Sequence, residues 1–244
     1  MEARKMSPAP IILRVIHLIK MGLLITMVLF TIFLINHFRL SNYFPIRTVY
    51  IYGANHLSQQ KVQEILQPLV AKGYFSIDVD YIRERLLQMS WVADIFVRRN
   101  WPDQIVVTVV EKKPIALWNK ENLLSDAGEL FNPPQLTFPH DIPLFHGPAG
   151  KHITMLQYFN NFNRILNPLH AKISYLELTP FLTWKLKLDN GITLQMGHKD
   201  ILTRITHFVK VYPKIVGTRA KDVEYIDLRY PNGVAIRWKE TIKT

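Results

Sequence analysis

Histidine, acidic and cysteine side chains are the ones most able to do chemistry, and their spacing in this sequence offers little. The nine histidines form no His-x-x-x-His or His-Glu-x-x-His pattern. His140, His146 and His152 lie in or beside a proline-rich segment, where Asp141 is the nearby carboxylate. The chain has no cysteine, which excludes zinc–thiolate sites, iron–sulfur clusters and cysteine nucleophiles. We therefore expect no metal site and no cofactor.

Two carboxylates close together could instead serve acid–base catalysis. Asp78 and Asp80 have that spacing, but a turn followed by a helix N-cap explains them equally well. The sequence contains no Gly-x-Ser-x-Gly motif, no phosphate-binding Walker loop and no glycine-rich dinucleotide fingerprint. We therefore predict no catalytic residues and no small-molecule substrate.

A basic patch with an aromatic residue in it is the remaining chemical signal. It comprises Arg98, Arg99, Trp101, Lys112 and Lys113, in a chain whose formal net charge is +11. Such charge favours anionic partners, which include nucleic acid, lipid headgroups and acidic polymers. No helix-turn-helix or ribonucleoprotein motif supports nucleic-acid binding. A solvated basic rim that faces headgroups or acidic partners is the interpretation we prefer.

The start of the chain predicts a membrane anchor. Met21–Ile35 carries no charge, and the apolar stretch continues to Phe38. Its 18 helical residues span about 27 Å, close to the ~30 Å hydrocarbon core of a bilayer. A cleaved signal peptide is the alternative, but the apolar run is long for one and no small-x-small cleavage site follows. We expect a retained transmembrane helix at residues 21–38.

The flanking charges predict its orientation. Arg4, Lys5, Arg14 and Lys20 precede the span, whereas only Arg39 and Arg47 follow it closely. The positive-inside rule then places residues 1–20 in the cytoplasm and the bulk of the chain across the membrane.

Periodicity divides the remainder into two sets of elements. The first set is a strand at 46–52, helices at 59–70 and 81–89, and strands at 93–99 and 104–110, with Asp80 expected to cap the second helix. The second set begins after Pro114 with a hairpin and a proline-rich surface loop at 132–150. It continues with a helix at 153–166, strands at 171–178, 183–188 and 192–196, a helix at 201–212 capped by Asp200, and two strands around Pro231-Asn232-Gly233. We predict an α+β protein.

Four stretches of this sequence resemble the FtsQ/DivIB family of bacterial cell-division proteins. They are "VYIYGANHLSQQKV", "SWVADIFVRRNWPDQIVVTVVEKKPIALW", "LLSDAGELF" and "VEYIDLRYPNGVAIRW". The most specific parts are Val97–Trp118 and Asp227–Tyr230. The resemblance implies a β-α-α-β-β POTRA domain at 46–113 and a mixed β domain with two helices at 114–240.

The same resemblance implies a function. The protein would be a non-enzymatic scaffold of the divisome, a single-pass protein of the bacterial inner membrane at the division septum. It would link early and late division proteins by binding FtsB and FtsL, and so control septal peptidoglycan synthesis. The alternative from another class is a membrane-anchored periplasmic enzyme that acts on cell-wall material.

The final strand is the predicted partner site. Val234–Trp238 has no later segment to pair with, so we expect an exposed sheet edge to which a partner, FtsB by resemblance, adds a strand. Arg229 would pair with a carboxylate of the partner, while Tyr230 and Trp238 would act as flat anchors, although both could simply pack in the β domain. The predicted partner-binding residues are Arg229, Tyr230, Asn232, Gly233, Val234, Ile236 and Trp238.

Overall fold

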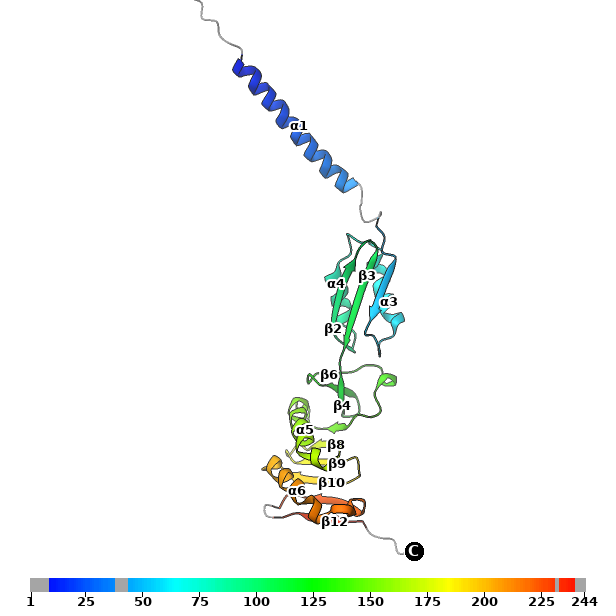
Figure 1. Ribbon diagram of the computed structural model, residues 1–244, viewed down its shortest axis with the longest axis vertical. Helices are drawn as coiled ribbons and strands as arrows, with labels where there is room; N and C mark the ends of the chain where they lie inside the picture. Colours follow the sequence, from blue (N-terminus) through cyan, green and yellow to red (C-terminus); the bar gives the residue numbers. More distant parts are fainter. Residues whose placement is uncertain (1–8, 38–43, 231–232, 240–244) are drawn as a thin grey trace, which may run out of the picture. The chain divides into compact units, whose positions relative to one another are not determined.

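A computed structural model describes residues 9–37, 44–230 and 233–239 (Figure 1). Helix α1, Ala9–His37, begins the described chain. Its stretch Arg14–Leu34 is long and apolar enough to cross a membrane, and its side chains are exposed. This stretch overlaps most of the anchor expected at 21–38, of which residue 38 lies outside the described residues.

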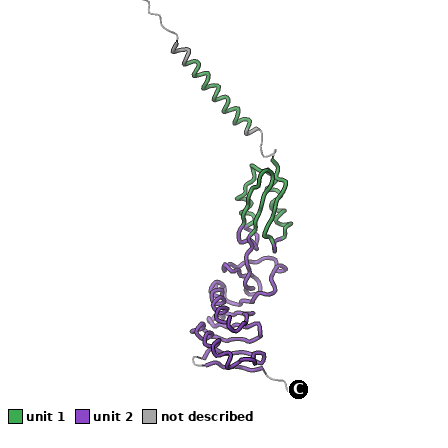
Figure 2. The backbone as a smooth tube through the Cα atoms, in the orientation of Figure 1, with its two compact units in different colours: residues 1–54, 58–86, 95–109 green, residues 55–57, 87–94, 110–244 purple. Residues whose placement is uncertain are grey.

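The chain divides into two compact units (Figure 2). The first comprises residues 1–54, 58–86 and 95–109, and the second comprises residues 55–57, 87–94 and 110–244. The boundary runs through the last two strands of the predicted β-α-α-β-β set, because residues 92–94 and 110–111 of those strands belong to the second unit.

A three-stranded sheet with two helices follows α1. Its strands lie in the order β1 (Thr48–Tyr52), β3 (Gln104–Glu111) and β2 (Val92–Asn100). β1 runs parallel to β3, although more than fifty residues separate them in the chain. Helices α3 (Gln59–Val70) and α4 (Val79–Leu87) complete the predicted β-α-α-β-β order.

The core of this sheet comes from alternate positions, as a half-buried strand requires. Ile105 and Val107 of β3 are fully buried and Val109 is buried, whereas Thr108, which lies between Val107 and Val109, is exposed. Val62 of α3 and Ile82 of α4 are also fully buried, because each helix presents one apolar stripe to the core.

The start of α4 differs from the sequence prediction. The carboxylate of Asp78, not Asp80, accepts hydrogen bonds from the backbone amides of Asp80 and Tyr81, at 3.1 and 3.0 Å. Asp78 is therefore the capping residue, and the helix begins two residues earlier than expected, at Val79. One of the two carboxylates considered for acid–base chemistry thus has a structural role.

A mixed nine-stranded sheet forms the rest of the chain. Its strand order is β12-β11-β10-β9-β8-β7-β4-β5-β6. The strands are β4 (Pro114–Trp118), β5 (Asn122–Ser125), β6 (Leu130–Phe131), β7 (Leu144–His146), β8 (Ile173–Leu178), β9 (Trp184–Leu188), β10 (Thr193–Gly197), β11 (Val223–Asp227) and β12 (Ala235–Trp238).

Two helices pack against each other and against this sheet. Helices α5 (His152–Leu166) and α6 (Ile201–Ile215) contribute Phe162 and Phe208 to a single large core, and both rings are fully buried. Short 3₁₀ turns lie at Gln135–Thr137, Asn167–Leu169 and Gly217–Asp222. The prediction of an α+β chain with one apolar helix, a β-α-α-β-β unit and a mainly β unit with two helices is confirmed.

Three local predictions in this region were wrong. The proline-rich segment is not only a surface loop, because β7 lies within it between β4 and β8, and Phe145 is fully buried. Asp200 has a left-handed φ of 50° and makes no side-chain cap at α6. The helix α6 also continues beyond Tyr212 to Ile215 and contains Pro213 in its last turn.

Candidate partner-binding site

Strand β12 lies at one end of the nine-stranded sheet. It pairs antiparallel with β11, so that Tyr225 is opposite Arg237 and Asp227 is opposite Ala235. Within residues 44–230 and 233–239, no other strand is hydrogen-bonded to its outer side. The expected edge strand is therefore present, four residues long.

The backbone groups on the outer side of β12 can be assigned from its register. The amide of Lys239 donates to the carbonyl of Asp222 at 2.7 Å, so it points toward β11. Amides alternate in direction along an antiparallel strand. The amides of Ile236 and Trp238 consequently point away from β11, whereas that of Arg237 points toward it. The irregularity in this pairing lies in β11, between Val223 and Tyr225, and leaves the alternation of β12 intact.

The side chains of β12 also alternate. Ile236 and Trp238 are partly buried and pack against the core of the nine-stranded sheet. Arg237 is exposed and forms an ion pair with Glu224 at 3.2 Å. The guanidinium of Arg219 lies over the Trp238 ring, 4.0 Å from its centroid. Trp238 thus packs within its own unit, as the alternative interpretation held, and still leaves part of its ring accessible.

An ion pair fixes the chain just after β11. The carboxylate of Asp227 is almost fully buried and accepts from Nε and Nη2 of Arg229, at 2.9 and 2.6 Å. It also accepts from the backbone amide of Arg229 at 2.9 Å. The side-chain hydrogen bonds from Arg229 hold the pKa of Asp227 below its ordinary value, although burial opposes this shift. The same bonds raise the pKa of Arg229, so the pair is fully charged at neutral pH.

Arg229 nevertheless remains available to a partner. Its side chain is 59% exposed, and a guanidinium carries five N–H donors, more than the Asp227 carboxylate uses. The pairing holds the arginine in place and prevents it from folding onto the surface elsewhere. It can therefore receive a second carboxylate with little loss of conformational freedom.

A shallow hollow lies beside this arginine. It has a volume of about 390 Å³ and is lined by Thr203, Arg204, His207, Leu228, Tyr230, Gly233 and Val234. Nη1 of Arg204 donates to the carbonyls of Leu228 and Arg229, which ties α6 to the segment after β11. Tyr230 is 57% exposed at its rim.

The structure thus brings most of the predicted residues to one edge. Arg229, Tyr230, Gly233 and Val234 surround or adjoin the hollow, and Ile236 and Trp238 follow along β12. Asn232 lies outside the described residues. Sequence reasoning missed Asp227, although its spacing of two from Arg229 at a strand end was a usable signal. It also missed Arg204, Arg219 and Glu224, because their proximity depends on tertiary packing.

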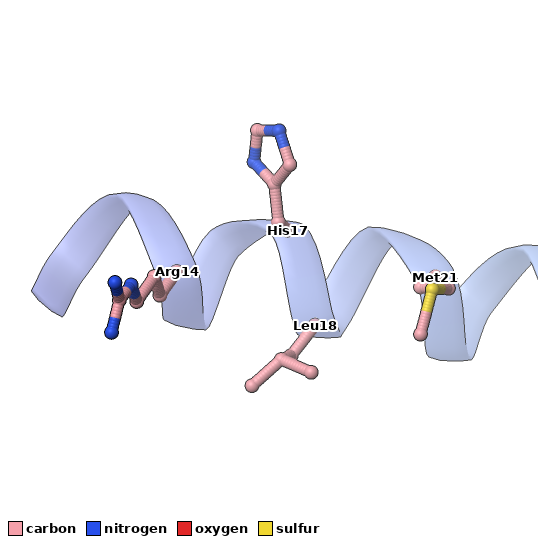
Figure 3. Close-up of a pocket in the computed structure, with 4 residues that line it drawn as sticks. All are labelled: Arg14, His17, Leu18 and Met21. Carbon is pink, nitrogen blue, oxygen red and sulfur yellow. The ribbon is translucent and has the colours of Figure 1, made fainter. Parts of the chain in front are cut away.

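A hollow on the N-terminal helix does not resemble a binding site. The hollow on α1 is lined by Arg14, His17, Leu18 and Met21, whose side chains point in different directions from one helix and do not converge (Figure 3). Within the described residues, histidines and acidic residues form no cluster of three or more that could hold a metal ion.

Comparison with known proteins matches both folded regions. A family described as POTRA domain, FtsQ-type, matches residues 44–112, which contain the three-stranded sheet and its two helices. A family described as Cell division protein FtsQ/DivIB, C-terminal, matches residues 116–229. The first region is therefore a POTRA-type domain.

Whole-chain relatives agree with this assignment. The cell division protein FtsQ of Coxiella burnetii is 36% identical over 196 residues, which is 80% of this chain and 81% of that protein. FtsQ of Burkholderia pseudomallei is 34% identical over 199 residues, 80% of each chain. FtsQ of Escherichia coli is 30% identical over 203 residues, covering 80% of this chain and 73% of its own. This chain belongs to the FtsQ/DivIB family of cell division proteins.

Proposed function

We propose that the protein is a non-enzymatic scaffold of the bacterial divisome that binds FtsB and FtsL. It is anchored in the inner membrane by α1, with its N-terminus in the cytoplasm and residues beyond α1 in the periplasm at the septum. By holding these partners it links early and late division proteins and controls septal peptidoglycan synthesis. Its family membership supports the division role, and the open edge at β12 carries the proposed binding mechanism.

Strand addition is the binding mode that this edge supports. FtsB supplies an extended segment whose backbone pairs with the outward groups of Ile236 and Trp238. A ladder of this kind gives affinity, and the side chains at alternate positions give specificity. The FtsB segment can add to this edge without a large rearrangement, because β12 is already paired with β11.

Three side chains complete the proposed interface. Tyr230 and Trp238 provide flat aromatic surface of the kind that dominates binding energy at protein interfaces. Arg229, fixed by Asp227, donates hydrogen bonds to a carboxylate of FtsB.

Alanine substitutions at the two aromatic residues test this site. We expect Tyr230→Ala and Trp238→Ala each to weaken FtsB binding at least about tenfold, which corresponds to roughly 1.4 kcal/mol. Phe181→Ala is the matched control, because Phe181 is 87% exposed in the turn between β8 and β9 and lies outside the proposed interface. Affinity would be measured by fluorescence anisotropy with labelled FtsB and the full-length chain in nanodiscs.

Folding must be measured alongside, since Trp238 also packs against the core. The circular dichroism spectrum and the melting temperature of each variant serve for this. If Tyr230→Ala and Trp238→Ala both fold normally and bind as tightly as the parent, the proposed site is wrong, and the contact with FtsB lies elsewhere, for example on the POTRA-type sheet.

A further inference from the structure

Four aromatic rings gather where the POTRA-type domain begins. They belong to Phe44, Tyr74, Phe75 and Trp101, here called the aromatic cluster. The Trp101 ring lies 5.2 Å from Phe44, 5.3 Å from Tyr74 and 5.9 Å from Phe75, measured between ring centroids. The backbone amide of Tyr74 donates to the carbonyl of Phe44 at 2.8 Å. Three separate segments of the chain thus form one cluster.

This cluster is not a buried core. Trp101 is 56% exposed and Phe75 is 50% exposed, in the turn between β2 and β3 and in the segment between α3 and α4 respectively. Exposed apolar rings held together in this way cost free energy in water and typically mark a contact surface. Tryptophan and tyrosine in particular favour the interface between membrane and water, where the ring is shielded and its polar group stays hydrated.

Positive charge surrounds the aromatic cluster. The exposed basic residues within three positions of a cluster member in the chain are Arg47, Lys72, Arg98 and Arg99. Arg47 pairs loosely with Asp103, at 3.9 Å, and its side chain stays 75% exposed. Nη2 of Arg99 donates to the carbonyl of Ile77, which holds that guanidinium beside the segment that carries Phe75. Asp103 and the capping Asp78 are the nearby acids, so the balance is positive and suits anionic phosphate groups.

The length of chain before the cluster restricts where it can lie. α1 ends at His37, and six residues separate it from Phe44. Seven Cα–Cα steps span at most about 25 Å even when fully extended. If α1 crosses a bilayer, the Cα of Phe44 therefore cannot lie farther than this from the end of α1, and the other three rings adjoin Phe44.

We propose that the aromatic cluster and its basic neighbours bind the headgroup layer of the membrane that α1 anchors. The partner is an anionic phospholipid surface: the rings insert at the level of the headgroups, and the arginines and lysine contact lipid phosphates. This inference rests on the proposed membrane anchoring by α1. It adds a second lipid contact, which limits how the POTRA-type domain can rotate about its linker.

Because the chain lacks cysteine, single cysteines can report on this contact. Ser76→Cys places a label next to Phe75. Gln59→Cys is the control, because Gln59 begins α3, whose 12 residues extend about 18 Å away from the segment that carries Tyr74. Each variant of the full chain would carry an NBD fluorophore in nanodiscs of phosphatidylethanolamine and phosphatidylglycerol, with and without lipid spin-labelled near the headgroups.

We expect the label at position 76 to emit at shorter wavelength and to lose intensity when spin-labelled lipid is present, whereas the label at position 59 is unaffected. Adding Phe75→Ser to the Ser76→Cys chain should remove most of this quenching. Adding Phe96→Ser, which removes a 59% exposed ring from β2, should leave it unchanged.

The other outcomes separate the two proposals. If the full chain does not insert into the nanodiscs, the membrane anchoring and the lipid contact both fail. If it inserts but the label at position 76 is no more quenched than that at position 59, the lipid contact is wrong and the anchoring stands. If the label at position 76 becomes shielded only when FtsB and FtsL are added, the aromatic cluster binds protein and the lipid proposal is likewise overturned.

Discussion

At the scale of single residues, the ion pair of Asp227 with Arg229 fixes the position of the arginine just after β11. An almost fully buried carboxylate needs a charged partner, and Arg229 supplies it while most of its own side chain stays exposed. One residue thus both neutralises a buried charge and offers donors to a partner. We propose that removing it affects both stability and partner binding, and the two effects can be measured separately.

The stability consequence depends on pH. The pKa of Asp227 is lowered from its ordinary value of 3.8, so the pair stabilises the fold above that pH, and the stabilisation is lost as pH falls through the folded-state pKa. We expect Arg229→Gln to lower the free energy of unfolding by about 1–2 kcal/mol at pH 6, allowing for the exposure of the arginine. The unfolding free energies of Arg229→Gln and of the parent chain, plotted against pH, should converge at the most acidic pH.

Urea unfolding of the full chain in micelles, repeated across the acid range, would check this. Arg237→Gln is the control, because its ion pair with Glu224 is exposed on both sides and should contribute within about 0.5 kcal/mol. A difference between Arg229→Gln and the parent that stays constant at every pH would mean that the arginine acts through packing and not through the Asp227 charge.

Single residues are also where sequence reasoning was weakest. Glu111 accepts from the backbone amides of Asn55 and His56, each at 2.8 Å, and contacts Nδ1 of His56 at 2.7 Å. These partners lie more than fifty positions away in the chain. A carboxylate at the end of a predicted strand gives no local sign that backbone amides of a distant loop will donate hydrogen bonds to it.

At the scale of elements, the close approach of β1 to β3 requires a glycine. Gly53 directly follows β1 with a φ of +78°, and a side-chain carbon there would collide with the carbonyl of Val109. Gly150 has nearly the same φ, +76°, but faces open space. The two glycines therefore share the backbone strain that a side chain would introduce and differ in the steric contact.

Substitution at both positions separates these effects. We expect Gly150→Ala to cost about 1 kcal/mol, the penalty for a left-handed conformation with a side chain. Gly53→Ala should cost at least about 2 kcal/mol more, since the parallel pairing of β1 with β3 has to shift. Thermal and urea unfolding of both variants would measure the difference between their losses of stability. Equal losses of stability would indicate that the β1–β3 contact is looser than described.

Most elements were predictable because their signals are local. The helices at 59–70 and 153–166 carry an apolar stripe with helical spacing, and Asp189-Asn190-Gly191 marks the hairpin between β9 and β10. β7 was missed because it has three residues flanked by prolines, and only parallel pairing with β4 and β8 makes it a strand. That pairing is a tertiary event with no local pattern.

At the scale of the whole molecule, α1 and the nine-stranded sheet have different proposed tasks. We propose that α1 holds the chain in the membrane and that the nine-stranded sheet binds partners at β12. The predicted order of anchor, β-α-α-β-β domain and mainly β domain followed from composition and periodicity. Composition and periodicity did not predict that residues 55–57 and 87–94 belong to the second unit, because this grouping reflects packing between segments far apart in the sequence.

Topology can be tested on the whole chain. Gly150 lies in an exposed turn where an added side-chain carbon would meet open space, so an inserted reporter should be tolerated there. We expect alkaline phosphatase fused at Gly150 to be active and a cytoplasm-dependent fluorescent protein at the same site to be dark, because the basic residues before α1 favour a cytoplasmic N-terminus. The reverse pattern of signals would contradict the orientation.

Strand addition at β12 is the central claim, and amide hydrogen exchange at single-residue resolution tests it most directly. The full chain in nanodiscs would be measured with and without a saturating concentration of FtsB. We expect the amides of Ile236 and Trp238, which point away from β11, to exchange rapidly alone and to become protected by FtsB, while the amide of Arg237 is protected throughout. Saturated binding that leaves Ile236 and Trp238 exchanging as fast as before would contradict it.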